Sequence, residues 1–397
     1  MIDFENEFTW NDGMCSDNNA VWFMGCQINA LFKMNVITGE INLIKIFSDT
    51  DIFDFRRFSI CKKYKHYIFC FPDIGNQIKV YDILRDSIHK IEFGALEQKR
   101  CGIMNAFLLD NRFFAVSISQ KQIIEIDAES REVVGYYPIF ENKEEKIGWE
   151  CIQIEEKIYC ISKTSNTVCE FDMKTRVYQY YFLPLKNNKG FNTICFVANK
   201  FWLSGNEKEI VVWDKKEERI DVLNISINDF EMYKVGKIET RQLFLNSVNT
   251  QDKIWFIPYL ANKMLVLDTK DLTIKTFEVT EEIENEKDIL LRNMQHKYIL
   301  ERVVDNCSIW LYSIKNKKVI EIDTNDYDIN YLKFWINKET KDKLWESWIK
   351  QSNRVVSEIN GQCIDKLLKE MQVKSKCSWN CNSVIGENIH RQIKNMI

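Results

Sequence analysis

The sequence predicts an all-β fold: a seven-bladed β-propeller of four-stranded antiparallel blades with a small C-terminal helical appendage. Three observations predict it. One sequence pattern recurs seven times within residues 14–336, and helical spacing of apolar residues is confined to the chain after residue 337. Within the repeats, short apolar segments alternate with turn residues about every ten positions. This spacing favours a repeat built of antiparallel strands over a parallel α/β repeat.

The recurring pattern is clearest in residues 158–184. Apolar residues around Tyr159 are followed by the polar turn 163–166, and a second apolar run ends at Asp172. Residues 177–182 close the pattern, which predicts three strands joined by two tight turns. A further apolar segment before each later copy, such as residues 105–109, supplies a fourth strand. Corresponding residues are 42 to 55 positions apart, a period typical of propeller blades.

Each copy carries one acidic or amide residue directly after an apolar residue at the end of a strand. We call these residues the anchors: Asn35, Asp82, Asp127, Asp172, Asp214, Asp268 and Asp323. A short side-chain oxygen can accept a backbone N–H two residues further on, so we expect each anchor to hold a turn. The turns would then share one face of the propeller, away from the usual ligand site. An array of metal-binding or catalytic acids is the alternative.

An aromatic residue lies twelve or thirteen positions before each anchor. These residues are Trp22, Phe69, Phe114, Tyr159, Trp202, Trp255 and Trp310. They fall in the second strand of each copy, where blades pack against one another, so we expect them to be buried between sheets. A stacking platform for sugars or bases is the sharper alternative.

The two ends of the chain differ from the repeats. Residues 1–20 contain apolar side chains and could pair with the last blade to close the ring. We expect a propeller domain over residues 1–336 and a helical extension over residues 337–397 that packs on it. The extension shows apolar residues three and four positions apart, such as Leu344, Trp345 and Trp348. A docking surface for a partner is its alternative role.

The extension contains residues that could in principle hold zinc. Cys363, Cys377, Cys381 and His390 carry suitable ligand atoms, but the cysteine spacing is loose and a paired second knuckle is missing. We therefore predict no metal and no cofactor. The chain has 13 cysteines, and those at repeat positions replace Ala, Phe or Leu of other copies, so we expect reduced core thiols.

Composition limits the partners. The 54 basic residues nearly balance the 58 acidic ones, which leaves no basic footprint for nucleic acid. No apolar run approaches the length of a membrane span, and the acidic N-terminus lacks the pattern of a secretory signal. We therefore expect a cytoplasmic protein that binds neither nucleic acid nor membrane.

Residues 21–40 and 254–268 carry a family resemblance. Their apolar openings, polar turns and anchors resemble the repeats of virginiamycin B lyase-like and kelch-like propellers. The lyase resemblance would imply a magnesium-assisted elimination that uses a His and a Glu-x-His pair. None of the four histidines, His66, His89, His296 and His390, follows a Glu by two positions, and the paired glycines of kelch blades are missing. The resemblance therefore supports the architecture and not that chemistry.

A ligand site is expected where the innermost strands begin. Trp10, Arg57, Arg100, Trp149 and Arg241 lie 10 to 14 residues before the blade aromatics, and arginine and tryptophan around a funnel suit an anionic or sugar-like ligand. Solvated loop residues are the alternative interpretation. Two longer connections, residues 226–240 and 279–297, reach the same face.

Two functions follow from this site. The first is a non-catalytic scaffold that binds a protein or a glycan through one propeller face. The second is a lyase or hydrolase with a polar site at the central funnel, since acids from different blades can converge without any local motif.

Overall fold

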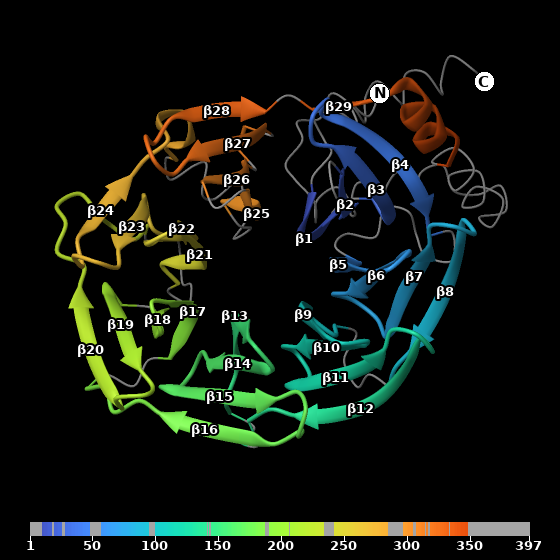
Figure 1. Cartoon of the computed structure of the whole chain (residues 1–397). Coiled ribbons are helices and arrows are strands. Elements are labelled where there is room, and N and C mark those ends of the chain that lie inside the picture. The colour runs from blue at the N-terminus through green and yellow to red at the C-terminus, as the bar shows by residue number, and fades with distance from the viewer. Residues whose placement is uncertain are drawn as a thin grey trace, which may run out of the picture.

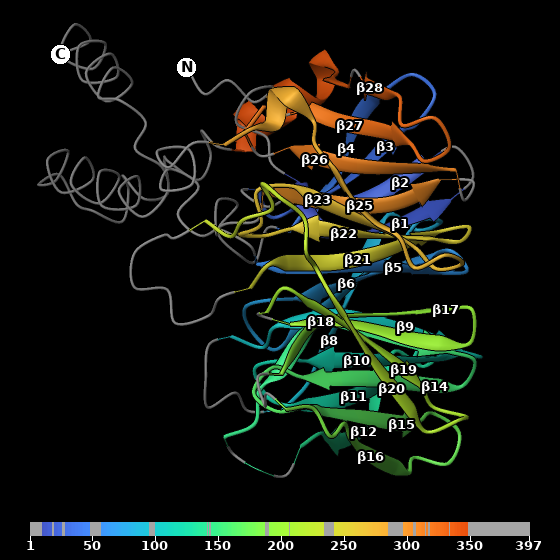
Figure 2. The same ribbon diagram turned by 90° about the vertical axis from the view of Figure 1, so that its left-hand side faces the viewer.

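The computed structural model confirms the seven-bladed β-propeller. It describes residues 10–17, 20–25, 28–47, 57–94, 100–140, 142, 144–186, 190–205, 207–233, 242–284, 297–304, 307–313, 315–316, 318–332 and 334–347, with the backbone alone for 10–12 and 299–304. Figure 1 looks along the central axis and shows the sheets around it, with the innermost strands nearest the axis. Figure 2 shows the same ring from its edge.

The first four blades follow one another in sequence, and each runs from its innermost to its outermost strand. Blade 1 has β1 (Trp10–Asp17), β2 (Ala20–Gly25), β3 (Ala30–Asn35) and β4 (Glu40–Ile46). Blade 2 has β5 (Phe58–Tyr64), β6 (Tyr67–Pro72), β7 (Gln77–Asp82) and β8 (Ser87–Glu92). Blade 3 has β9 (Ile103–Leu109), β10 (Arg112–Ser117), β11 (Gln122–Asp127) and β12 (Glu132–Pro138). Blade 4 has β13 (Ile147–Ile154), β14 (Lys157–Ser162), β15 (Thr167–Asp172) and β16 (Tyr178–Phe182).

The remaining three blades keep the same strand order. Blade 5 has β17 (Phe191–Val197), β18 (Lys200–Gly205), β19 (Glu209–Asp214) and β20 (Arg219–Asn224). Blade 6 has β21 (Phe244–Thr250), β22 (Lys253–Pro258), β23 (Met264–Asp268) and β24 (Ile274–Phe277), followed by the 3-10 helix η1 (Thr280–Glu282). Blade 7 has β25 (Tyr298–Val304), β26 (Ser308–Ser313), β27 (Lys318–Asp323) and β28 (Ile329–Leu332).

Every anchor holds the turn between the third and fourth strands of its blade. In blade 4, Asp172 Oδ1 accepts the backbone N–H groups of Lys174 and Thr175 at 2.9 and 2.8 Å. The other six anchors accept a backbone N–H two or three residues further on in the same way. The predicted structural role is therefore confirmed, because these oxygens already satisfy turn N–H groups.

One apolar cluster fills each seam between neighbouring blades. Between blades 3 and 4, Phe114 of β10 packs against Phe171 of β15 with ring centroids 6.0 Å apart. The other seams likewise combine a second-strand aromatic with the residue before the next blade's anchor. All seven aromatics are at most 6% exposed, so they form core and not a stacking platform.

The ring closes differently from the expectation. The described part of the N-terminal stretch, β1, pairs with β2 as the innermost strand of blade 1 and not with blade 7. Closure comes from the chain that follows blade 7, because β29 (Trp335–Ile336) adds a parallel fifth strand to β4 at the outer edge of blade 1. The sequence missed this two-residue strand because it is too short to show alternation.

A helix follows β29, and its described part covers residues 338–347. Asn337 caps it, since its Oδ1 accepts the N–H of Thr340 at 2.8 Å. Leu344 and Trp345 pack into the cluster between blades 7 and 1. The helix thus lies against the ring beside blade 1 (Figure 1). The division at residue 336 stays a prediction, and the zinc candidates Cys363, Cys377, Cys381 and His390 lie outside the described residues.

The described cysteines are free and, with one exception, buried. Cys15, Cys61, Cys70, Cys101, Cys151, Cys160, Cys169 and Cys195 are buried, and Cys307 is half-buried. The eight buried cysteines lie within the seams as small core residues, and burial raises the pKa of the Cys70 thiol well above its usual range. In this part of the chain, no helix has the length and apolar content needed to cross a membrane.

Candidate ligand-binding face

The propeller has two unlike faces. Because neighbouring strands are antiparallel, the start of each innermost strand lies at the same end of the blade as the turn between the second and third strands. We call this end the upper face, and the end that carries the anchor turns the lower face. Of the residues predicted for a ligand site, Trp10, Arg57, Arg100 and Trp149 lie at or just before the start of innermost strands, so they belong to the upper face.

Arg57 and Arg100 converge on the turn 72–76 of blade 2. The carbonyl of Arg57 accepts the N–H groups of Asp73 and Ile74 at 3.0 and 3.2 Å. Arg100 donates from Nε and Nη2 to the two carboxylate oxygens of Asp73, at 2.8 and 3.1 Å. A Cβ at Gly75 would lie 3.0 Å from Arg57 Nη2, so the glycine leaves room for this guanidinium. Two predicted residues from different blades thus meet at one turn.

Arg100 also has a structural role. Asp73 is almost completely buried, whereas the Arg100 side chain is 50% exposed. The carbonyl of Asp73 accepts the N–H groups of Cys101 and Gly102, both at 2.9 Å. These bonds fasten the turn of blade 2 to the first residues of blade 3, and the remaining guanidinium surface stays open to solvent.

Trp149 lies in blade 4 and pairs with a cation that the sequence did not single out. Its ring is half-buried, and Lys163 Nζ lies 5.7 Å from the ring centroid. The backbone carbonyl of Trp149 accepts Asn105 Nδ2 at 3.1 Å, which ties blade 4 to blade 3. Lys163 belongs to the turn between β14 and β15, so both partners lie on the upper face.

Of the other two predicted residues, the structure describes only the backbone of Trp10. Trp10 is the first residue of β1 and pairs with Gly25, but its side chain lies outside the described residues. Arg241 lies outside them entirely. The structure therefore brings Arg57 and Arg100 together, places Trp149 in the next blade along, and leaves the five-residue site a prediction.

The described parts of the two long connections meet on the upper face. Phe230 is buried in the seam between blades 5 and 6, and Met232 forms a bridge with Ala261. Tyr233 donates its hydroxyl to the carbonyl of Glu284, at 2.9 Å, which joins the first connection to the second. Glu282 is buried and accepts the Ser313 hydroxyl at 2.6 Å. These segments are packed against the blades and against each other.

Glu150 links three blades beside the axis. It lies in β13 of blade 4, and its Oε2 accepts the N–H of Ile194 in blade 5 at 2.8 Å. The same carboxylate accepts the N–H of Ser247 in blade 6 at 3.2 Å and its hydroxyl at 2.8 Å. Cys195, next to Ile194, also faces Ser247, and burial raises the pKa of its thiol.

Burial changes the acidity of Glu150. Desolvation raises the pKa of the carboxyl to about 8, and the three hydrogen bonds oppose this shift without cancelling it. Sequence reasoning missed this residue, although one signal was present: Glu150 is the one acidic residue of β13 and lies between Trp149 and Cys151. That signal alone could not show that the side chain reaches two further blades.

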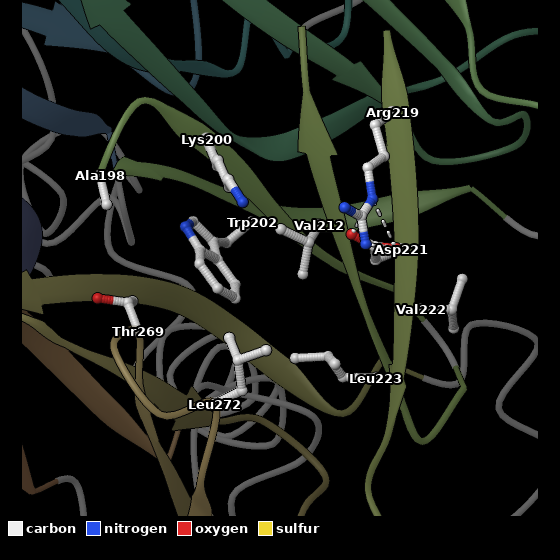
Figure 3. Close-up of a pocket in the computed structure, with 10 residues that line it drawn as sticks. All are labelled: Ala198, Lys200, Trp202, Val212, Arg219, Asp221, Val222, Leu223, Thr269 and Leu272. Atoms are coloured by element: carbon white, nitrogen blue, oxygen red, sulfur yellow. Dashed lines mark hydrogen bonds and ion pairs between the residues drawn. The ribbon is translucent and has the colours of Figure 1, made fainter. Parts of the chain in front are cut away.

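A separate pocket of about 370 Å³ lies between blades 5 and 6 (Figure 3). Trp202, Val212 and Leu223 form its apolar wall on the blade 5 side, and Leu272 lies across from them in the anchor turn of blade 6. Arg219 and Asp221 form an ion pair at its rim, with Nε and Oδ2 3.0 Å apart. The pocket belongs to the lower half of the seam and contains none of the predicted site residues.

The described histidines do not reach the upper face. His66 lies in the turn between β5 and β6, and His89 lies in the outermost strand β8. Within the described ranges, no group of three or more His, Cys, Asp or Glu residues is arranged to hold a metal ion.

The solved structures that are similar to this chain include the following three. A streptogramin B lyase is 14% identical, with a TM-score of 0.55, and the match covers 81% of this chain and 93% of that chain. The likeness is one of fold alone. A computationally designed protein, Ika8, is 10% identical with a TM-score of 0.53, covering 83% of this chain and 89% of its own. A chain of a mitotic checkpoint complex is 10% identical with a TM-score of 0.54, covering 82% and 89%.

These likenesses confirm the propeller fold, including the resemblance to lyase-type propellers at the level of architecture. No protein-family model and no curated protein sequence matches the chain.

Proposed function

We propose that the protein is a non-catalytic recognition scaffold that binds a protein or a glycan ligand through its upper face. One observation carries the proposal. Arg57, Arg100 and Trp149 come from three consecutive blades and all belong to this face, whereas the lower face is occupied by seven similar anchor turns. Arginine and tryptophan are enriched among the residues that dominate binding energy at interfaces.

The chemistry of these side chains suits recognition. Half of the Arg100 side chain is exposed while its position is fixed by Asp73, so the guanidinium is held before any ligand arrives. A fixed guanidinium can bind a carboxylate or phosphate with two parallel hydrogen bonds. The Trp149 ring adds apolar surface that is only half-buried.

The alternative, a lyase or hydrolase at the central funnel, has one observation in its favour. Glu150 has a carboxyl whose pKa of about 8 suits proton transfer near neutral pH. Its oxygens, however, are engaged by donors from blades 5 and 6, as expected of a group that holds blades together. We therefore prefer the scaffold. The near balance of basic and acidic residues supports a partner other than nucleic acid. A cytoplasmic location and the absence of a membrane partner belong to the same proposal.

The test compares ligand capture by two matched double variants. Tagged protein is used to capture partners from the source cell and to probe a glycan array. Arg57→Ala with Trp149→Leu removes one guanidinium and one ring from the upper face. Capture of the specific ligands should fall about tenfold or more, since a central hot-spot side chain contributes about 2 kcal/mol or more.

The control removes an arginine and an aromatic ring elsewhere. Arg85 lies in the lower-face turn of blade 2, and Tyr136 lies on the exposed side of β12. Arg85→Ala with Tyr136→Leu should capture the same ligands as the wild type. Equal capture by both double variants and the wild type would exclude the upper face as the recognition surface.

A further inference from the structure

Lys163 is a desolvated cation of the upper face that has no anionic partner among the described residues. Its Nζ lies 5.7 Å from the Trp149 ring centroid. Its backbone N–H donates to the carbonyl of Lys146 at 2.7 Å, so the backbones of the two lysines lie side by side. Burial, followed by the charge of Lys146, lowers the pKa of the Lys163 ammonium. The nearby carboxylate of Glu145 is engaged by the Ser165 hydroxyl.

Other half-buried lysines of the same blade region show the usual arrangement. Lys157 and Lys215 both bind the carboxylate of Glu170, and their pKa values are raised. A cation that loses hydration normally gains a carboxylate in this way. Lys163 instead gains a ring and a like charge, which is an arrangement that an incoming anion would stabilise.

The backbone around Lys163 is held in place before any ligand binds. Ser162 Oγ accepts the N–H groups of Thr164 and Ser165 at 3.2 and 3.0 Å. Gly190, at φ +72°, passes so close that a Cβ there would lie 2.2 Å from the carbonyl carbon of Lys163. A rigid turn of this kind reduces the entropy that a ligand must remove on binding.

We propose that Lys163 and Lys146 form an anion-binding subsite of the upper face. It would take the carboxylate or phosphate group of a sugar-like ligand, while the Trp149 ring holds the Lys163 ammonium in position. The subsite rests on the proposed function, because it gives the recognition face a preference for ligands that carry negative charge.

Calorimetric titration of the full chain with three small probes tests the subsite. The probes are glucose, glucuronate and glucose 6-phosphate, which share a ring and differ in charge and anion type. Both anionic sugars should bind about tenfold or more tightly than glucose, because hydrogen bonds to charged groups contribute about 1.5–3 kcal/mol. A preference for one anionic sugar over the other would identify carboxylate or phosphate as the recognised group.

Two charge-matched variants locate the binding. Lys163→Gln should remove the advantage of the anionic sugars over glucose. Lys216→Gln, an equal change at an exposed residue of the lower-face turn in blade 5, should keep it. Equal affinity for all three probes, or an equal loss in both variants, would overturn the proposal.

A second measurement uses the unmodified sequence, so it does not require a variant to fold. In protein with isotope-labelled lysine side chains, adding inorganic phosphate should shift the Lys163 side-chain NMR signal and raise its pKa. An unchanged Lys163 signal at saturating phosphate would overturn the subsite. If the protein captures partners but does not bind the anionic probes, the subsite alone is rejected. If the Arg57 and Trp149 substitutions leave partner capture unchanged, the recognition function is rejected.

Discussion

The two faces of the propeller are built from different kinds of interaction. On the lower face, seven anchors satisfy seven turns through the same bond between a side-chain oxygen and a backbone N–H. On the upper face, a serine holds the turn between the second and third strands in blades 3, 4 and 7. Three other contacts, on that face or beside the axis, do not recur in this way: Arg100 with Asp73, Lys163 over Trp149, and Glu150 across three blades.

The comparison separates structural residues from candidate functional ones. An interaction that every blade needs is a requirement of the blade, so its chemistry says nothing about a ligand. A polar group that appears in one blade only is not required by the repeat and must be explained individually. By this criterion the seven carboxylate or amide anchors are structural, and the few singular residues of the upper face are the candidates.

The largest expected effect is the loss of stability when an aromatic side chain is removed from a seam between two blades. Trp255 is completely buried between blades 6 and 7, and its Nε1 donates to Thr250 Oγ1 at 3.2 Å. Trp255→Ala should lower the free energy of unfolding by about 3–5 kcal/mol, measured by urea denaturation, because it leaves a cavity and an unpaired hydroxyl. Val222→Ala, on the exposed side of blade 5, should change it by less than about 0.5 kcal/mol. A small loss at Trp255 would contradict the assignment of the seam aromatics as core.

The next effect concerns the singular residue Glu150 and its dependence on pH. The unfolded chain releases this proton near pH 4.5, whereas the folded protein keeps it until about pH 8. The folded state therefore binds more protons between these values, and its stability falls as pH rises, by at most about 1.4 kcal/mol per pH unit. Glu150→Gln should make the stability profile flatter between about pH 5 and pH 8.

A residue of the same hairpin provides the control for Glu150. Glu155 is exposed in the turn between β13 and β14. Glu155→Gln should leave the pH profile of the wild type unchanged. If the Glu150→Gln variant kept the wild-type slope, the carboxyl would already be ionised at neutral pH, and the raised pKa of Glu150 in the folded protein would be wrong.

The smallest effect tests one lower-face turn. Asp172→Ala removes the acceptor of two turn N–H groups and should cost about 0.5–1.5 kcal/mol of stability, measured by thermal and urea unfolding. Asp172→Asn keeps an acceptor oxygen, as Asn35 does in blade 1, and should be close to neutral. A loss for Asn as large as that for Ala would show that the negative charge matters and not the acceptor oxygen, and would reopen a functional interpretation of the anchors.

The repeats allowed much of the architecture to be predicted. An anchor and its turn N–H groups are two or three residues apart. Because this interaction is local, each turn could be predicted from the sequence. The aromatic residues of the seams could also be predicted, because an aromatic residue lies twelve or thirteen positions before every anchor. The pairing of β29 with β4 could not be predicted from the sequence, because only two residues of each strand, 335–336 and 40–41, take part in it.

The site was predicted less completely. Arg57, Arg100 and Trp149 were chosen because they precede innermost strands, and they do belong to the upper face. Neither their partners nor their roles followed from the sequence: Asp73 and Lys163 come from turns between other strands. Glu150 was overlooked because its partners, Ile194 and Ser247, are 44 and 97 residues away.

The sequence by itself determined the number of blades, the turns that separate their strands and the rings that fill the seams. It could do so because strand alternation and turn chemistry act over a few neighbouring residues and recur in every blade. Only the tertiary structure decided which polar groups meet at the axis and on the upper face. Closing the ring brings side chains from different blades into contact, and that proximity sets the ion pairs, the desolvation of Lys163 and the acidity of Glu150.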